Sequence, residues 1–197
     1  MNKGIKTALC IICASLSLTL ISCGKGPQLD EVKDHVAATV DKSIELNEIF
    51  YGEGLPVFTE MITGNDYYLV DTEKSDYDTI DELKAALAEI YTTDYCTAMN
   101  EVMFVGIADN LGSLLPRFIE EDMSGMLMQD KYAENILPGD RVFDYAAMTM
   151  ERSSKNSFTV RIPATRNGEK EADAVLTFRR EISSDGKAVW KLDSPTY

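Results

Sequence analysis

Histidine is almost missing from this sequence, which contains only His35. Because histidine is the usual general base near neutral pH, a nucleophilic hydrolase here would have to pair His35 with Cys96. Nothing in their spacing brings them together, so we expect His35 to be an ordinary residue on a helix surface. The sequence also lacks a P-loop, a glycine-rich dinucleotide turn and a serine elbow. These absences argue against an enzyme.

Cysteine is scarce as well, with four residues at positions 10, 13, 23 and 96. The first three fall in an N-terminal segment discussed below, so only Cys96 remains for the folded part and no intrachain disulfide can form there. A domain of about 170 residues can bury an adequate core without disulfides. Cys96 falls in a predicted helix, where we expect a small buried apolar residue.

Positive charge is also in short supply. The chain has 19 Lys and Arg against 33 Asp and Glu, a net charge of −14. Such a protein is repelled by nucleic acid and other polyanions, including anionic lipid head groups, so we expect no nucleic-acid partner. A basic partner would be attracted, although many exported domains are acidic for solubility alone.

Metal-site and cofactor motifs are lacking too. Residues 71–82 superficially resemble a twelve-residue calcium loop, with Asp71 first and Glu82 last. The sixth position requires glycine for its sharp turn, but it is Asp76 here. We therefore expect a solvated loop that leads into a helix N-terminus, where acidic residues are favoured. The sequence predicts neither a metal nor a cofactor.

What is present at the N-terminus has the pattern of an export signal. Lys3 and Lys6 precede an apolar stretch of residues 8–21, which is too short to span a membrane and has the length of a signal-peptide core. The stretch ends in Leu20-Ile21-Ser22-Cys23, the order of a lipobox. We predict a signal peptide over residues 1–22, a lipidated Cys23 and a short linker over 23–28. Residues 29–197 would then form one domain, anchored by its acyl chains outside a bacterial membrane.

The first part of that domain has helical periodicity. Apolar residues recur every three to five positions between Leu29 and Phe50, which predicts one long helix. Thr79 and Glu82 form a capping box before a second helix that ends near Tyr91. A third helix is expected after residues 92–94, whereas residues 106–115 give no clear pattern.

Extended segments dominate the rest. We predict a strand over 67–70 and a hairpin between 117–120 and 126–128. Four strand-like runs follow, covering 142–150, 158–162, 174–179 and 188–192, with tight-turn dipeptides at 167–168 and 185–186. Helices packed on one face of an antiparallel meander give an α+β fold. The order of elements resembles the cone-shaped cystatin-like or nuclear-transport-factor-like group.

Two features could bind a partner. A cone-shaped domain can enclose a pocket, lined here by Tyr, Met and Phe residues and Trp190, although these side chains could equally fill the core. The acidic run Glu120, Glu121 and Asp122 could enter a basic cleft of another protein, with electrostatic steering, or could simply be a solvated hairpin tip.

A further pattern consists of the segments 67–69, 77–79, 91–92, 116–120, 126–127 and 190–194, together with Leu83 and Leu87. In these positions, over about residues 66–194, the sequence resembles the IseA-type inhibitors of bacterial cell-wall DL-endopeptidases. The resemblance implies an exported, non-catalytic protein that blocks cell-wall cysteine peptidases with an acidic surface. The lipid anchor and residues 106–115 depart from the family pattern, and no motif identifies its inhibitory residues here. Binding of a small ligand in a cone pocket is the alternative function.

Overall fold

The computed structural model describes residues 25–60, 66–106, 108–109, 112–113 and 115–197. The predicted signal peptide and Cys23 lie outside these residues. The described chain has the expected α+β architecture, with helices and several antiparallel sheets. Most of its buried apolar residues form one core cluster between Val32 and Leu192, so a chain that begins at Lys25 keeps that cluster. None of the described helices has the length and apolar character needed to cross a bilayer.

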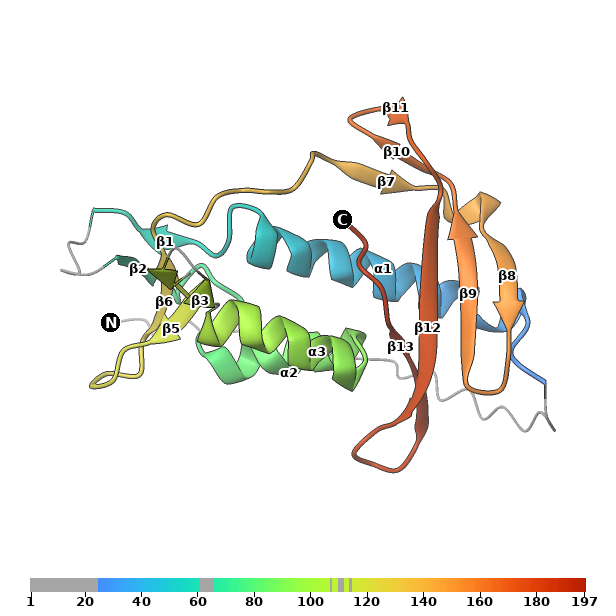
Figure 1. The fold of residues 1–197 in the computed structure, drawn as a ribbon, viewed down its shortest axis with the longest axis horizontal. Helices are drawn as coiled ribbons and strands as arrows, with labels where there is room; N and C mark the ends of the chain where they lie inside the picture. The colour runs from blue at the N-terminus through green and yellow to red at the C-terminus, as the bar shows by residue number, and fades with distance from the viewer. Residues whose placement is uncertain (1–24, 61–65, 107, 110–111, 114) are drawn as a thin grey trace, which may run out of the picture.

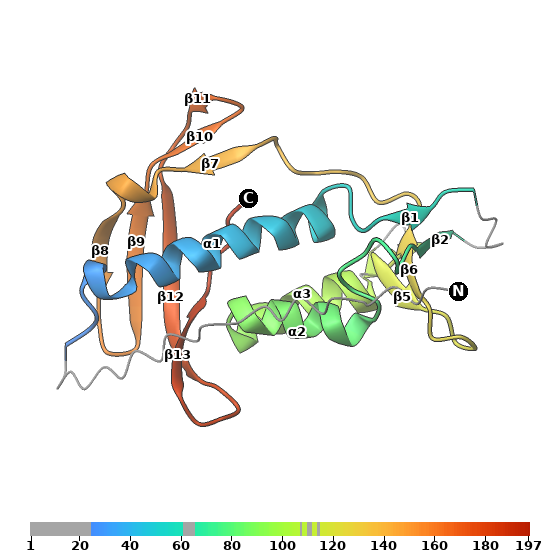
Figure 2. The same cartoon turned by 180° about the vertical axis from the view of Figure 1, so that it is seen from behind.

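The first predicted helix is confirmed as α1, Leu29–Tyr51. At its start, the Gln28 N–H donates to Glu31 Oε2 at 2.7 Å, so the Glu31 side chain caps the helix. Val32, Val36 and Val40 form its fully buried stripe. Seen from behind, α1 begins beside the C-terminal four-stranded sheet at one end of the molecule. It runs toward a second four-stranded sheet at the other end (Figure 2).

The second and third predicted helices are also confirmed. They are α2, Ile80–Ile90, and α3, Thr93–Asn100, which continues into a π-helical turn, η1, over Glu101–Val105. Thr79 and Glu82 make the expected capping box: Glu82 N donates to Thr79 Oγ1 at 3.2 Å, and Thr79 N donates to Glu82 Oε2 at 3.2 Å.

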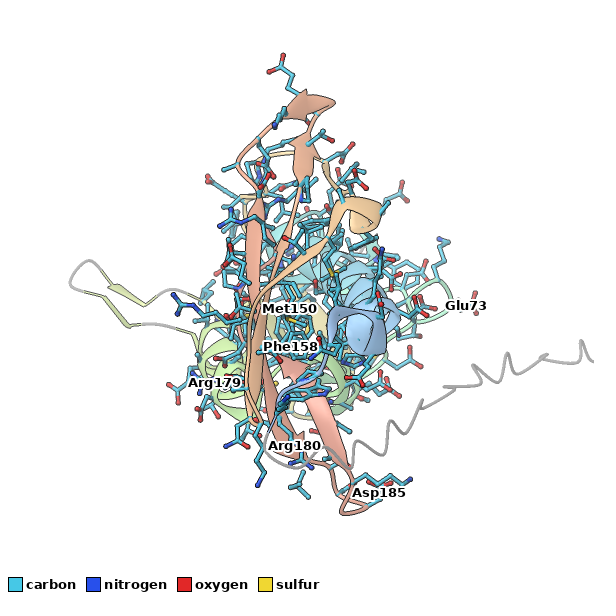
Figure 3. The ribbon with its side chains drawn as sticks, turned by 90° about the vertical axis from the view of Figure 1, so that its right-hand side faces the viewer. Glu73, Met150, Phe158, Arg179, Arg180 and Asp185 are labelled. Atoms are coloured by element: carbon cyan, nitrogen blue, oxygen red, sulfur yellow. The ribbon has the colours of Figure 1, made fainter. Side chains whose placement is uncertain are left out.

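The C-terminal sheet has the strand order β13-β12-β9-β8. Its strands are β8, Thr149–Ser153; β9, Ser157–Ile162; β12, Ala174–Ile182; and β13, Ala188–Leu192. All pairs are antiparallel, as the meander predicted. Alternate residues of β9 are buried against the helices. Met150 and Phe158 lie on the α1 side of this sheet, and Arg179 lies on the opposite face (Figure 3).

Two details of the predicted meander are wrong. The run 142–150 is not one strand, because the Asp144 side chain accepts hydrogen bonds from Ala146 N and Ala147 N and bends the chain into a 3-10 turn, Tyr145–Ala147. This turn separates β7, Arg141–Phe143, from β8. The dipeptide Asn167-Gly168 does not join β9 to β12.

That dipeptide instead closes an additional small hairpin, and both of its residues have positive φ (51° and 81°), as a tight turn requires. The hairpin strands are β10, Ala164–Arg166, and β11, Glu169–Lys170, and with β7 they form a separate three-stranded sheet. Glu171 accepts hydrogen bonds from Arg141 and Arg166 and so joins β7 to this hairpin.

A second four-stranded sheet lies at the other end of the molecule (Figure 1). Its order is β1-β2-β6-β5, formed by β1, Val57–Phe58; β2, Tyr67–Val70; β6, Leu127–Asp130; and β5, Phe118–Glu120. The predicted strand 67–70 and hairpin 117–128 are therefore confirmed. In the region without a clear pattern, β3, Ala108–Asp109, pairs with β4, Gly112–Ser113.

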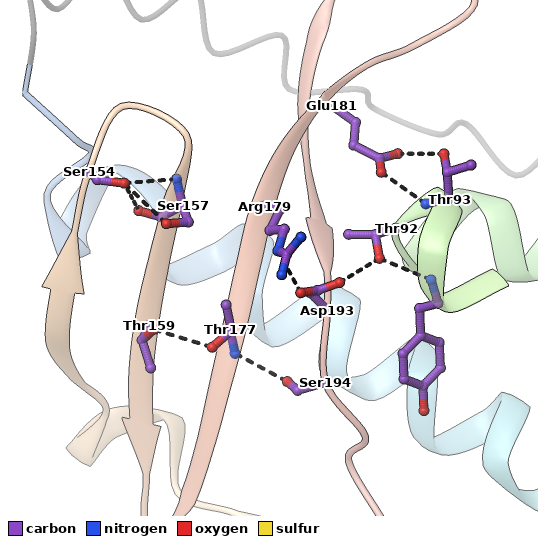
Figure 4. Close-up of polar contacts among 11 residues, drawn as sticks. Thr92, Thr93, Ser154, Ser157, Thr159, Thr177, Arg179, Glu181, Asp193 and Ser194 are labelled. Atoms are coloured by element: carbon purple, nitrogen blue, oxygen red, sulfur yellow. Dashed lines mark hydrogen bonds and ion pairs between the residues drawn. The ribbon is translucent and has the colours of Figure 1, made fainter. Parts of the chain in front are cut away.

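Polar contacts attach the helices to the C-terminal sheet (Figure 4). Asp193 accepts a hydrogen bond from Thr92 Oγ1 at 2.7 Å and forms an ion pair with Arg179 at 2.6 Å. Glu181 accepts from Thr93 N at 2.9 Å. These bonds hold the start of α3 against strands β12 and β13, so the helices and this sheet form one unit.

Candidate functional site: the acidic hairpin

The β5–β6 hairpin protrudes from one end of the molecule, and residues 122–126 at its tip are exposed (Figure 1). We call residues 120–126 the acidic hairpin. Its turn is closed by Gly125 N, which donates to Glu121 O at 2.8 Å, and by Glu121 N, which donates to Met126 O at 3.0 Å. Gly125 has a φ of 66°, which glycine adopts without strain. The Ser124 hydroxyl donates to the Glu121 carboxylate and accepts from Met126 N at 3.2 Å. The tip therefore has a defined shape.

Glu120 connects the acidic hairpin to α2. Its Oε1 accepts a hydrogen bond from Ile80 N, at the first residue of that helix, at 2.8 Å. The first amides of a helix have no partners within the helix, so the Glu120 carboxylate on β5 acts as a cap for α2. The bond places Glu120 at the N-terminus of α2, which is rich in acidic residues before and within its first turn: Asp76, Asp78, Asp81 and Glu82.

The acids of the hairpin differ in what they bind. Glu120 is engaged with α2, and Glu121 with Ser124. Asp122 is exposed at the tip. A negative surface of this kind, with several carboxylates from two segments, repels polyanions and attracts a basic surface.

An exposed methionine stands next to these acids. The Met123 side chain is 94 % exposed, and Met126 is 44 % exposed. A flexible thioether side chain adapts to irregular apolar surfaces, so methionine is common where a protein contacts a partner. The tip thus offers an apolar side chain within an acidic border, the layout of a small interface with a polar rim.

Buried polar side chains hold the base of the hairpin. Arg117, directly before β5, donates from Nε to Ile49 O at 3.0 Å and from Nη2 to Gly52 O at 2.7 Å. These carbonyls lie at the C-terminal end of α1, whose last turn has no basic residue of its own. Burial lowers the pKa of the Arg117 guanidinium. The hairpin is therefore fixed to α1.

Gln129 on β6 makes a second attachment. Its Oε1 accepts from Leu55 N at 2.7 Å, and its Nε2 donates to Glu53 O at 3.2 Å. Gly54 passes so close that an added Cβ would lie 2.2 Å from Gln129 Oε1, and its φ is +88°. Neither Arg117 nor Gln129 was singled out in the sequence. Their partners are main-chain groups distant in sequence, so no local pattern could have identified them.

The two candidate catalytic residues lie elsewhere. The expectation that His35 is an ordinary surface residue is wrong: it is half-buried between α1 and the sheet. Its Nε2 lies 2.9 Å from Trp190 O, and its ring packs edge-on against Phe178. Burial lowers the pKa of His35, and the nearby Lys191 lowers it further. The packing of α1 on β12 and β13 produces this environment, and the helical pattern alone could not reveal it.

Cys96 is buried in α3, as predicted, and its thiol contacts Tyr91 O at 3.7 Å. Burial raises its pKa to about 11. At neutral pH only about one thiol in ten thousand would then be ionised, and the thiolate is the nucleophilic form. His35 and Cys96 each bond to a different main-chain carbonyl. The geometry therefore does not present them as a nucleophile and its base.

The loop that resembles a calcium site uses its acids for other contacts. Asp71 is buried, forms an ion pair with Lys74 at 2.6 Å, and accepts from Glu73 N. Glu82, at the far end, caps α2 as described above. Within the ranges that the structure describes, no group of three or more His, Cys, Asp or Glu side chains is placed to hold a metal ion.

The aromatic side chains that could have lined a pocket pack against one another. Phe158 stacks on Phe178 with ring centroids 4.9 Å apart, and Trp190 contacts Phe158 edge-on at 5.0 Å. At the other end, Phe50 contacts Phe104 and Phe118. These rings belong to the core or pack on it.

Comparisons with models of protein families, with curated proteins and with solved structures find no match to this chain.

Proposed function

We propose that this chain is a non-catalytic bacterial lipoprotein, attached to the outer face of a membrane through Cys23. In this proposal the acidic hairpin binds a cell-wall hydrolase of the DL-endopeptidase type and inhibits it. The proposal includes a cone-shaped fold of the cystatin-like or nuclear-transport-factor-like kind. The observation that carries it is the acidic hairpin, a rigid protruding turn with carboxylates around an exposed methionine.

The shape of the hairpin supports this role physically. Binding costs less when the binding segment is already ordered, and the tip is held by four internal hydrogen bonds and by Glu120 on α2. Its carboxylates would accelerate encounter with a basic cleft, and Met123 would be buried in the complex. The lipobox supports the location, and the resemblance to the inhibitor family supports the class of partner.

The environments of His35 and Cys96 support a non-catalytic role. The histidine is held at a helix–sheet interface, and Cys96, the one cysteine among the described residues, has a raised pKa. An inhibitor needs only a complementary surface.

The test is inhibition of a purified DL-endopeptidase by residues 25–197, measured at low and at high salt. We expect inhibition that weakens as salt screens the acidic surface. The double variant Glu121→Gln and Asp122→Asn should inhibit less. Glu134→Gln with Asp140→Asn removes the same charge elsewhere and serves as the matched control. Absence of inhibition at both salt concentrations would overturn the inhibitory role.

A further inference from the structure

We propose that a polar hollow beside the predicted lipidation site binds the phosphate groups of anionic membrane lipids, and that it seats this end of the domain on the bilayer. The hollow has a volume of about 420 Å³ and is lined by residues 25, 26, 28 and 153–155. This inference rests on the proposed lipid anchor at Cys23 and goes beyond the inhibitory role.

The walls of the hollow come from two distant segments that lie against each other. The Ser153 hydroxyl on β8 donates to Pro27 O at 2.7 Å. Gly26 lies so close to β8 that an added Cβ would be 2.2 Å from Ser153 Oγ and 2.4 Å from Ser154 N. The segment predicted to be a short linker is thus packed against the β8–β9 hairpin from Gly26 onward.

The chemistry of the lining suits an anion. Lys25 and Lys155 bring ammonium groups, and Gln28 brings an amide that can donate. The hydroxyls of Ser153 and Ser154 donate to Pro27 O and Ser157 O, so they shape the hollow. A phosphate group matches the charge of two lysines.

Neighbouring charges favour the same ligand. Arg152 directly precedes the lining serines and is exposed. Arg180 on β12 is also exposed, and its backbone N–H donates to Asn156 O in the β8–β9 turn. Two of the nearby acids are engaged: Glu31 with Gln28 N, and Glu151 with Arg161. Asp30, in the first turn of α1, carries a negative charge that would repel the anion.

The length of the tether selects a membrane lipid as the source of the phosphate. Lys25 is two residues after Cys23, so their Cα atoms are at most about 7 Å apart. A lipidated Cys23 therefore holds the hollow at the depth of the head groups. Interactions between exposed charges fade beyond a Debye length, about 8 Å at physiological salt, so the acidic hairpin at the opposite end would oppose this contact little.

The test uses the chain from residue 23 with Cys96→Ala, coupled through Cys23 to a maleimide lipid. The vesicles contain phosphatidylcholine alone or with one third phosphatidylglycerol. Acylation rates of Lys25 and Lys155 are measured by mass spectrometry, with Lys170 as the internal reference. We expect both lysines to be protected severalfold more in the anionic vesicles. Equal rates in the two vesicles would overturn the proposal. So would equal protection by the same concentration of inorganic phosphate, which would indicate a site for free phosphate.

A variant pair then tests the residues. Residues 25–197 with Lys25→Gln and Lys155→Gln should bind anionic vesicles at low salt about 25-fold more weakly, from roughly fivefold per lysine. Lys42→Gln with Lys170→Gln makes the same change in charge away from the hollow and should bind like the unchanged chain. An equal loss in both variants would mean that only total charge matters, and would overturn the site. Because the coupling is synthetic, failure of natural lipidation, measured by the mass of the exported chain, is a separate outcome.

Discussion

Glu120 on β5 and Ile80 at the start of α2 are joined by a hydrogen bond of 2.8 Å, from the backbone N–H of Ile80 to the carboxylate of Glu120. This bond fixes the direction of the acidic hairpin relative to the helices. Replacing Glu120 by Ala should lower the free energy of unfolding by about 0.5–1 kcal/mol, as for loss of a helix cap. Urea denaturation measures the change. Glu120→Gln keeps an acceptor and should retain most of the stability, and a larger loss in Gln than in Ala would contradict this role.

A substitution at Met123 can test partner binding with little effect on the stability of the fold. The Met123 side chain is 94 % exposed, so Met123→Ser should change the free energy of unfolding by less than about 0.5 kcal/mol. If the tip enters a partner, the same change should weaken inhibition of the endopeptidase about tenfold or more, as for a central interface residue. Tyr132→Ser, at a side chain that is 68 % exposed outside the hairpin, is the control. Unchanged inhibition by Met123→Ser would remove the methionine from the interface.

Arg117 should be among the most important polar residues for folding. Its guanidinium satisfies two main-chain carbonyls at the end of α1. Arg117→Met leaves these buried acceptors without their donors and should cost about 2–4 kcal/mol. Arg117→Lys keeps the charge but cannot reach both carbonyls in the same geometry, so we expect an intermediate loss. Thermal and urea unfolding of both variants measure the difference, and a loss below 1 kcal/mol for Arg117→Met would contradict this account.

Asp193 and Arg179 form an ion pair, but they should contribute unequally. Asp193 also accepts from the buried Thr92, whereas the Arg179 side chain is 56 % exposed. Arg179→Ala should cost less than about 1 kcal/mol, because exposed ion pairs contribute little. Asp193→Ala should cost about 2 kcal/mol, since the Thr92 hydroxyl loses its acceptor as well. Equal losses in the two variants, measured by urea denaturation, would show that the ion pair dominates.

His35 should make stability depend on pH. Burial lowers its pKa in the folded chain below the ordinary value near 6.5, so the unfolded chain takes up the proton at higher pH. Above about pH 6.5, His35 is neutral in both the folded and the unfolded chain and does not change the free energy of unfolding with pH. Stability then falls as the pH drops from there to the lowered folded pKa, and the loss is complete below it. The charge of nearby Lys191 lowers the pKa of His35 as well, whereas the hydrogen bond to Trp190 O raises it. In His35→Gln the urea midpoint should decline less between pH 7 and pH 5, and an identical decline would contradict the prediction.

Local patterns predicted most of the elements. The capping box at Thr79, the helical period from Leu29 and the alternation over β9 depend on neighbouring residues, and each appears in the structure. The split of 142–150 was missed, although Asp144 is a side chain that favours a turn. Alternation over a short run cannot show where a strand changes sheets, and the small hairpin with β7 depends on such a change.

The candidate site was predicted only in part. The acids 120–122 could be named from the sequence because charge is visible there. Their attachment to α2, and the fixing of Arg117 to α1, depend on contacts between segments 40 to 68 positions apart. The same holds for His35, whose partner Trp190 is 155 positions away. Such contacts arise from packing, which no local spacing encodes.

The placement of the two four-stranded sheets at opposite ends of α1 has a mechanical consequence. A helix of 23 residues is about 35 Å long and stiff, so α1 acts as a spacer of fixed length between the end near residue 25 and the acidic hairpin. A molecule anchored at the first end can reach only partners whose binding surface lies within roughly that height above the lipid. The helix length, more than the hairpin itself, would then decide which enzymes at the cell surface come within range.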